Sequence, residues 1–334
     1  MTVAALPTRR RHPAVSPAAR FVAWRLVSSV AVLLVVSFVV FAFMHVAPGG
    51  PEQSIGGRFA TPEQLDAIRE RYGLNDPLWV QYTSFLASAL HFDLGTSFSL
   101  RTPVTTAIAG AAGVSISLLL MAWVSSTVIG VLLGVVSARH PGGLVDRAVV
   151  GFTVVGASSP VFVTGVLLAY VFGVVLGWFP TLGAGTVGVD RLAHLVLPAA
   201  TLVILALAAT SKVARVRISQ VQEEDHVTFS EARGLSSTHV LTNSVLRNAG
   251  VQIVTQASAS MIALVGALIV VESVYSIDGL GSALVSAIST RDIPMIQAIT
   301  LLLATFIVVV NFVADLLCLA IDPRMRMGLG DRRG

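Results

Sequence analysis

Few residues of this chain have the type and spacing that catalysis or cofactor binding requires. A phosphate-binding loop of the form G-x-x-x-x-G-K-[ST] is absent, because the single lysine, Lys212, follows Ser211 without the required glycines. The motifs H-E-x-x-H, C-x-x-C and G-x-S-x-G are absent as well. The single cysteine, Cys318, permits no intramolecular disulfide and is interpreted as a buried small apolar residue. We therefore predict no catalytic residue and no metal site.

Ionisable residues beside long apolar runs are the next candidates, because charge at membrane depth is costly and often marks function. Glu272 ends one such run, where a gate and a structural ion pair are both open interpretations. Asp315 lies near the end of the last run, where snorkelling or helix capping competes with ion binding. His45, His194 and Lys212 are interpreted as interfacial or topology-anchoring residues. A proton relay would need several facing acids, which the sequence does not supply.

A polar stretch at residues 225–255 separates two apolar runs and carries Arg233 and Arg247. It is predicted to form two short helices hinged at Gly234. Its partner is either the inner leaflet of a membrane or another protein. Acidic residues outnumber basic ones around the first helix, and anionic lipid would repel them, so protein docking is favoured.

The elements that position these residues are predicted to cross a membrane. Apolar residues make up 54% of the 334 positions and charged residues 12%, and the mean hydropathy is +0.82. A soluble fold could not bury this much apolar surface. The net charge of +4 comes from arginines between apolar runs, which favours membrane orientation over nucleic-acid binding. Six spans are predicted, at Leu26–Met44, Ala107–Ala138, Val161–Gly177, Leu195–Thr210, Ala249–Val271 and Met295–Ile321.

The first apolar run has a signal peptide as its alternative interpretation. The apolar core of a signal peptide usually has about 7–15 residues, and this run is longer and has basic flanks, which favours a retained span. A polar segment follows, in which Thr61 and Gln64 form a capping box that starts a helix ending near Gly73. Apolar residues at helical spacing predict a second short helix from Leu78 to Leu90.

Arginine placement predicts the topology. With the N-terminus inside the cell, most of the 22 basic residues fall on the inner side. The predicted fold class is an all-α integral membrane protein with six transmembrane helices and both termini in the cytoplasm. The predicted segments are a cytoplasmic tail (1–24), the first transmembrane helix (25–46), an extracytoplasmic segment (47–105), a five-span core (106–321) whose cytoplasmic loop covers about 212–248, and a second cytoplasmic tail (322–334).

Eight short motifs occur in a specific order and spacing: APGGP (47–51), TPEQLDAIRERYGLNDPLWVQY (61–82), DLGTSF (93–98), HLVLPA (194–199), ARGL (232–235), LRNA (246–249), VVESVYSIDGLG (270–281) and IDPRMR (321–326). Together they resemble the B-type permease subunit of bacterial dipeptide and oligopeptide ABC importers, over about residues 25–326. The resemblance implies a type I ABC importer permease fold in the bacterial inner membrane, with a small helical extracytoplasmic segment after the first span. It also implies that the chain itself is not an enzyme.

The partners follow from the same resemblance. It implies a second homologous permease that completes the pathway, and an extracytoplasmic peptide-binding protein. It implies two cytoplasmic ATPase subunits, or one fused ATPase, which bind ATP and Mg, so that this chain binds no cofactor directly. Permeases for nickel, glutathione or glycan fragments resemble this chain closely and are alternatives for the cargo. A self-sufficient secondary transporter or a membrane-bound enzyme is disfavoured, since inverted repeats and catalytic motifs are both absent.

The resemblance also implies functional residues. The loop at 219–248 corresponds to the family's EAA coupling loop, which sits in a groove of the ATPase. Its candidate coupling residues are Phe229, Ala232, Arg233, Gly234, Leu235, Arg247 and Asn248. The usual Glu-Ala-Ala is replaced by Thr228–Ser230, with Phe229 as the expected apolar plug, and Gln252 replaces a usual proline. The candidate gate or pathway residues are Glu272, Tyr275, Gly279 and Gly281.

Overall fold

The computed structural model describes residues 17–46, 50–57 and 60–321. The predicted tails at 1–16 and 322–334, most of the turn at 47–51 and the side chain of His45 lie outside the described residues. In the described ranges the regular secondary structure is helical, apart from an isolated bridge between Thr96 and Pro103.

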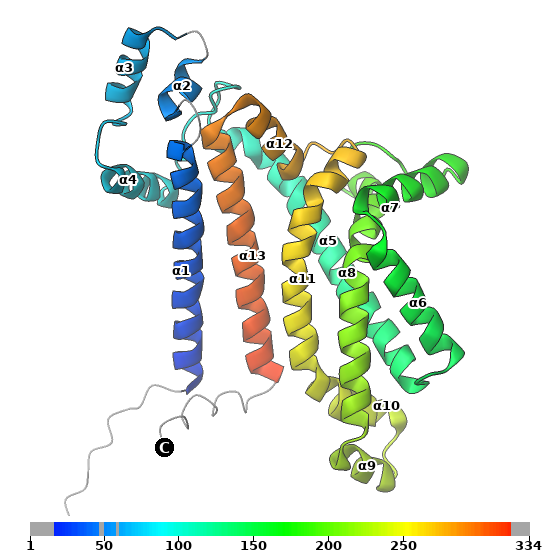
Figure 1. The fold of residues 1–334 in the computed structure, drawn as a ribbon. Helices are drawn as coiled ribbons and strands as arrows, with labels where there is room; N and C mark the ends of the chain where they lie inside the picture. The colour runs from blue at the N-terminus through cyan, green and yellow to red at the C-terminus, as the bar shows by residue number, and fades with distance from the viewer. Residues whose placement is uncertain (1–16, 47–49, 58–59, 322–334) are drawn as a thin grey trace, which may run out of the picture.

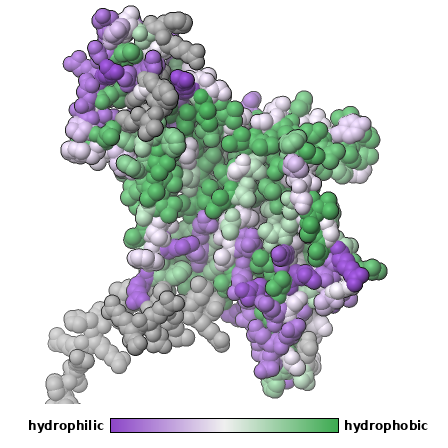
Figure 2. Space-filling model, in the orientation of Figure 1, coloured by the Kyte–Doolittle hydropathy of each residue, from purple (hydrophilic) through white to green (hydrophobic). Residues whose placement is uncertain are grey.

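Five long apolar helices lie side by side and form the body of the molecule (Figure 1). They are α1 (Pro17–Val46), α5 (Val104–Arg139), α8 (Val189–Gln222), α11 (Leu246–Val274) and α13 (Ile293–Ile321). Figure 2 shows the resulting apolar band, with hydrophilic residues gathered beyond it. We call the end of the bundle where α1 begins and α13 ends the terminal end, and the other the distal end.

The third predicted span, Val161–Gly177, is helical from Val161 to Val175 but follows a helix that was not predicted. A helix, α6 (Leu144–Ser158), begins well before Val161 and is followed by α7 (Val161–Leu168) and the π-helical segment η1 (Ala169–Val175). The two parts bend by 108° at Ser159 and Pro160, so they count as one span only as a broken pair. Pro160 lacks a backbone N–H and favours an extended conformation in the residue before it, which ends α6 at Ser158.

The fourth predicted span ends too early. Helix α8 continues past Lys212 to Gln222, so the loop predicted at about 212–248 begins about three helical turns later. Buried Ala214, Ile218 and Val221 extend the apolar face of α8 through this region. Their helical spacing keeps the chain helical although arginines lie between them.

The polar segment after α1 forms three short helices at the distal end: α2 (Gly50–Gly56), α3 (Pro62–Arg71) and α4 (Leu78–Leu90). The predicted capping box is confirmed, since Thr61 N–H donates to Gln64 Oε1 at 3.0 Å and Gln64 N–H donates to Thr61 Oγ1. The predicted bounds of α4 are also confirmed. A loop at 93–103 follows α4, and we call α2–α4 with this loop the distal segment.

Helix α11 lies centrally and contacts α5, α7, α8, α12 (Leu280–Thr290) and α13, since its many Ala, Ser and Gly residues let neighbouring helices approach closely. Helices α5 and α8 approach closely: a Cβ added to Gly134 would lie 2.5 Å from Ala214 Cβ. The main buried cluster draws leucines from α5, α8 and α11, including Leu118, Leu202 and Leu264. Helix α1 lies outside this cluster and packs along α13.

Candidate functional site

The predicted hinge in the polar stretch is present at the terminal end. Helix α9 (Asp225–Ala232) ends before Gly234, whose φ of +76° lies in the left-handed region that glycine adopts without strain. The chain then forms α10 (Ser237–His239) and the π-helical segment η2 (Val240–Val245), which runs directly into α11. We call residues 225–245 the terminal lobe.

The terminal lobe has a small core of its own that joins it to the long helices. Val227, Val240 and Val245 are buried, and they belong to one cluster with Ile218 of α8 and Ala249 of α11. Because these side chains fill one cluster, the lobe and the adjoining ends of α8 and α11 are packed as one body.

The outer surface of the lobe presents an apolar side chain in polar surroundings. Phe229 is 63% exposed, and the Arg233 guanidinium lies 5.8 Å from the centre of its ring. Leu235 is 43% exposed, and Ala232 and Gly234 are exposed beside it. Figure 2 shows that this end of the molecule is otherwise largely hydrophilic. An exposed Phe and Leu on such a lobe are typical of a surface that a protein partner covers.

The two remaining coupling candidates lie at the first turn of α11. Arg247 and Asn248 are both exposed. The Asn248 amide donates to Ser244 O at 2.8 Å and lies 3.1 Å from His226 Nε2 in α9. Asn248 therefore connects the start of α11 to α9, so that the residues predicted on both sides of the hinge lie at the same end of the molecule.

The second candidate set surrounds a buried carboxylate at the distal end. Glu272 is fully buried near the end of α11, and its Oε1 accepts a hydrogen bond from Ser115 Oγ of α5 at 2.5 Å. Its Oε2 accepts from Ser282 N–H at 2.9 Å. Ser115 Oγ in turn accepts from Leu280 N–H at 2.7 Å. Glu272 and Ser115 thus satisfy backbone donors in the first turn of α12, where a negative charge is favoured.

Gly279 and Gly281 leave room for the Glu272 carboxylate. A Cβ on Gly279 would lie 2.1 Å from Glu272 Oε1. A Cβ on Gly281 would lie 2.8 Å from the Cα of Ile269 and 3.0 Å from Glu272 Oε2. Both positions are buried, and any side chain there would force Glu272 or the α11 backbone to move.

Tyr275 joins three elements at the same end. It is 1% exposed, and its hydroxyl donates to Gly165 O of α7 and contacts Thr201 Oγ1 of α8, both at 3.0 Å. Its backbone carbonyl accepts from Gly183 N–H at 2.8 Å. Together with Glu272, Gly279 and Gly281 it forms a buried distal junction of α5, α7, α8, α11 and α12. Because all four residues are buried inside the chain, their role in a gate or pathway stays a prediction.

Three acidic residues that the sequence analysis did not assign to a partner lie in polar contacts between elements. Asp315 of α13 forms an ion pair with Arg25 of α1, a contact that differs from snorkelling, helix capping and ion binding, the three interpretations given for Asp315. Buried Asp146 accepts from Arg215 of α8 at 2.6 Å and from Gly142 N–H at 2.8 Å. Asp315 lies in an apolar run, whereas Asp146 and Asp292 lie in polar connections beside arginines, and the sequence names no partner for any of the three.

The third of these residues is Asp292, between α12 and α13. It is fully buried, and its Oδ2 accepts hydrogen bonds from the hydroxyls of Ser97 and Ser99 and from Ser99 N–H. Burial raises the pKa of the Asp292 carboxyl, but these hydrogen bonds outweigh burial and hold the pKa below its ordinary value. Asp292 therefore remains a carboxylate at neutral pH.

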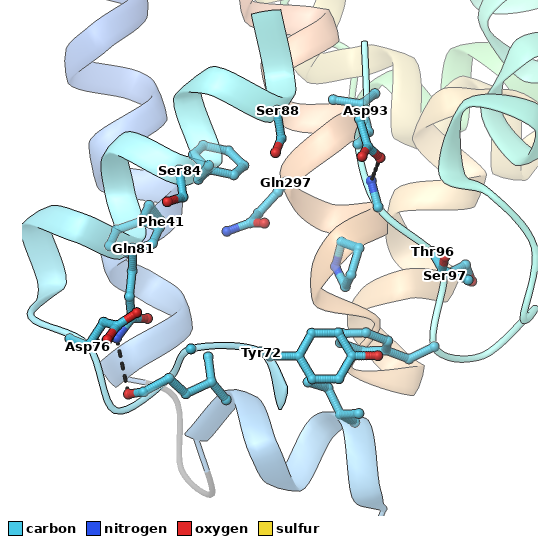
Figure 3. Close-up of a pocket in the computed structure, with 18 of the residues that line it drawn as sticks. Phe41, Tyr72, Asp76, Gln81, Ser84, Ser88, Asp93, Thr96, Ser97 and Gln297 are labelled. Carbon is cyan, nitrogen blue, oxygen red and sulfur yellow. Dashed lines mark hydrogen bonds between the residues drawn. The ribbon is translucent and has the colours of Figure 1, made fainter. Parts of the chain in front are cut away.

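A half-open cavity of about 660 Å³ lies beside Asp292, between the distal segment and the start of α13 (Figure 3). Tyr72, Ser84 and Ser88 line it from the distal segment, and Gln297 lines it from α13. Its walls mix polar and aromatic side chains. Among the described residues, no group of three or more His, Cys, Asp or Glu side chains is placed to hold a metal ion.

Comparison with known proteins identifies the family. Residues 130–327 match the binding-protein-dependent transport system inner membrane component family, and residues 18–119 match the N-terminal part described for the same systems. The chain belongs to this family. The permease is the membrane component of an ABC importer, in which separate ATPase subunits hydrolyse ATP. Such an importer implies ATPase and substrate-binding partners.

Curated relatives cover nearly the whole chain. A probable peptide ABC transporter permease of Sinorhizobium fredii is 35% identical over 305 residues, which are 90% of this permease and 97% of the relative. A putative peptide transport system permease of Brucella abortus is 34% identical over 307 residues, with the same coverage. The glutathione transport system permease GsiC of Escherichia coli K12 is 35% identical over 306 residues, which are 92% of this permease and 98% of GsiC.

Solved structures support the fold. A chain of the inward-facing methionine ABC transporter MetNI superposes with a TM-score of 0.52 at 17% identity. The match covers 64% of this permease and 96% of that chain. This permease therefore carries a substantial part that the aligned chain lacks, and the common part confirms the expected importer permease fold.

Proposed function

We propose that this permease carries short peptides and forms half of the translocation pathway, with a second homologous permease forming the other half. An extracytoplasmic peptide-binding protein delivers the cargo. Two cytoplasmic ATPase subunits, or one fused ATPase, bind ATP and Mg and drive transport. The peptide cargo is supported by relatives named as peptide permeases that match 90% of the chain.

The observation that carries the coupling proposal is the terminal lobe. It presents Phe229 to the outside while its own core is continuous with α8 and α11. An ATPase that moves the exposed surface therefore moves two long helices that reach the distal junction. ATP and the delivery protein can shift the equilibrium between inward- and outward-facing states only if each binds one state better.

Orientation follows from charge. The terminal end carries Arg139, Arg147, Lys212, Arg215 and Arg217 on or beside its helices. We assign this end to the cytoplasm by the positive-inside rule. The distal segment then faces the outside of the inner membrane, where a delivery protein docks.

Glutathione is the second candidate cargo. It is itself a small peptide-like molecule, and GsiC is as similar to this permease as the peptide permeases are. Uptake of labelled tri-alanine and labelled glutathione, each competed by the other, separates the two cargoes.

The coupling role is tested at Gly234. A Cβ there would meet open space, so only the left-handed backbone conformation opposes substitution. Gly234→Val should cost about 1–2 kcal/mol in that conformation and abolish ATP-driven uptake, while membrane insertion stays intact. Gly234→Asn is the matched control, because asparagine tolerates this conformation, and it should retain uptake. Wild-type uptake by Gly234→Val would contradict the coupling role.

A further inference from the structure

Among the described residues, hydrogen bonds attach the distal segment both to α1 and to the start of α13. The first attachment is to α1, where the Tyr82 hydroxyl of α4 lies 2.8 Å from Ser37 Oγ and 3.0 Å from Leu34 O. The rings of Phe38 and Phe41 lie 5.4 Å from the Tyr82 ring. Helix α1 itself lies at the edge of the bundle, so this attachment does not reach the core.

The second attachment is the contact of loop 93–103 with Asp292. The loop is closed on itself, since Ser97 N–H donates to Thr102 O at 2.9 Å and Val104 N–H donates to Gly95 O at 3.0 Å. Three donors from Ser97 and Ser99 converge on Asp292 Oδ2, with Ser99 Oγ at 2.6 Å and Ser99 N at 3.0 Å. Ser97 and Asp292 are almost completely buried. We call this contact the Asp292 clamp.

The Asp292 clamp lies at one end of a short connection to the core. Asp292 N–H donates to Ala287 O at 2.8 Å, which fixes the clamp to the last turn of α12. The first turn of α12 is held by Glu272 and Ser115 in the distal junction. Helix α12, with 11 residues, therefore connects the distal segment to the end of α11. Helix α11 in turn continues to the terminal lobe.

The Asp292 clamp consists of hydrogen bonds to a charged acceptor. Hydrogen bonds to an ionised acceptor are about twice as strong as neutral ones, but a buried carboxylate is costly to desolvate. Serine hydroxyls and the Ser99 N–H satisfy Asp292 Oδ2, and the Met295 N–H of α13 donates to Oδ1 at 3.4 Å. The contact with the loop is strong while its three donors are aligned and weakens when the loop shifts, because Oδ2 then loses these partners.

We propose that Asp292 is a positioning residue that clamps loop 93–103 to α12, so that docking at the distal segment is transmitted through α12 and α11 to the terminal lobe. The inference rests on the proposed function, in which a delivery protein docks at this end. The cavity in Figure 3 borders the clamp, since Ser97 and Gln297 both line it. A protein that binds to the distal segment at this cavity can therefore contact both the loop and the start of α13.

The test uses the complete importer in nanodiscs, with ATPase hydrolysis measured alone and with the delivery protein loaded with tri-alanine. Asp292→Asn and the double variant Ser97→Ala/Ser99→Ala should keep basal hydrolysis but lose about fivefold or more of the stimulated rate. The matched control is Ser286→Ala/Ser289→Ala, which removes two exposed hydroxyls of α12 away from the loop and should keep full stimulation. Hydrogen exchange should be faster at residues 93–103 in the clamp variants only.

A rescue variant separates transmission from folding. In a background with Cys318→Ser, the pair Ser97→Cys and Asp292→Cys should lose stimulation, and a short bifunctional thiol cross-linker should restore it. Full stimulation without the clamp would overturn the proposal, as would equal loss of basal and stimulated hydrolysis, or unchanged exchange at residues 93–103. A wild-type importer that tri-alanine-loaded delivery protein does not stimulate would instead contradict the proposed function, and the exchange measurement still decides whether the clamp exists.

Discussion

The two ends of α11 use polar residues in opposite ways. At the distal end, Glu272 and Tyr275 are buried and form hydrogen bonds with neighbouring helices of the same chain. At the terminal end, Phe229, Arg233 and Arg247 are exposed around a glycine hinge. A buried network fixes the relative position of helices, whereas an exposed lobe over a small core leaves its surface for a partner. The distal junction is therefore tightly packed within the chain, whereas the terminal lobe has an exposed surface.

The largest effect is expected from filling the space beside Glu272. Gly281→Val places side-chain atoms against the backbone of Ile269, 2.8 Å from the position of Cβ, and this backbone cannot move without displacing α11. Overpacking of this kind typically costs about 1–3 kcal/mol and occasionally more. Folded permease should be strongly reduced in detergent, as measured by fluorescence-detected size exclusion.

The matched control for this variant is Gly266→Val in α11, where an added Cβ meets open space. Its level of folded permease should stay near that of the wild type. Equal folding of Gly281→Val and Gly266→Val would show that the distal junction is not tightly packed, and the contrast between the two ends would fail.

A smaller loss of stability is expected when the Glu272 carboxylate is removed. Glu272→Ala leaves backbone donors of α12 buried without their acceptor, at about 1–3 kcal/mol for each group. Its melting temperature should fall clearly, whereas Glu272→Gln, which keeps an acceptor oxygen, should fall less. The matched position at the other end is Arg247, where Arg247→Ala should leave the melting temperature unchanged and reduce uptake. A destabilised Arg247→Ala with a stable Glu272→Ala would reverse the assignment of the two ends.

The smallest effect is expected at the ion pair between Arg25 and Asp315, which holds α1 along α13 at the terminal end. Both side chains are partly exposed, at 44% and 22%, and such pairs contribute about 1 kcal/mol or less. Arg25→Gln should therefore lower the melting temperature only slightly. The reversed pair Arg25→Asp/Asp315→Arg should restore it, and a large loss in the single variant would place this contact among the rigid ones.

Several elements could be predicted correctly from short-range features of the sequence. The capping box at Thr61 and Gln64 and the hinge at Gly234 depend on residues within a few positions of each other, and both are present as predicted. The apolar runs likewise identified the long helices, and the ordered motifs identified the family. The apolar runs did not predict helix α6 or its direction: it is bent by 108° from the following helix across Ser159 and Pro160.

The sequence by itself therefore determined the membrane class, the long helices and the hinged polar loop, because apolar periodicity, capping and turn chemistry are local. Only the tertiary structure decided which carboxylates have partners. Asp292 meets Ser97 across 195 positions, and Asp315 meets Arg25 across 290. Such contacts depend on how helices pack against one another, and a single sequence carries no signal that names the two members of a distant pair.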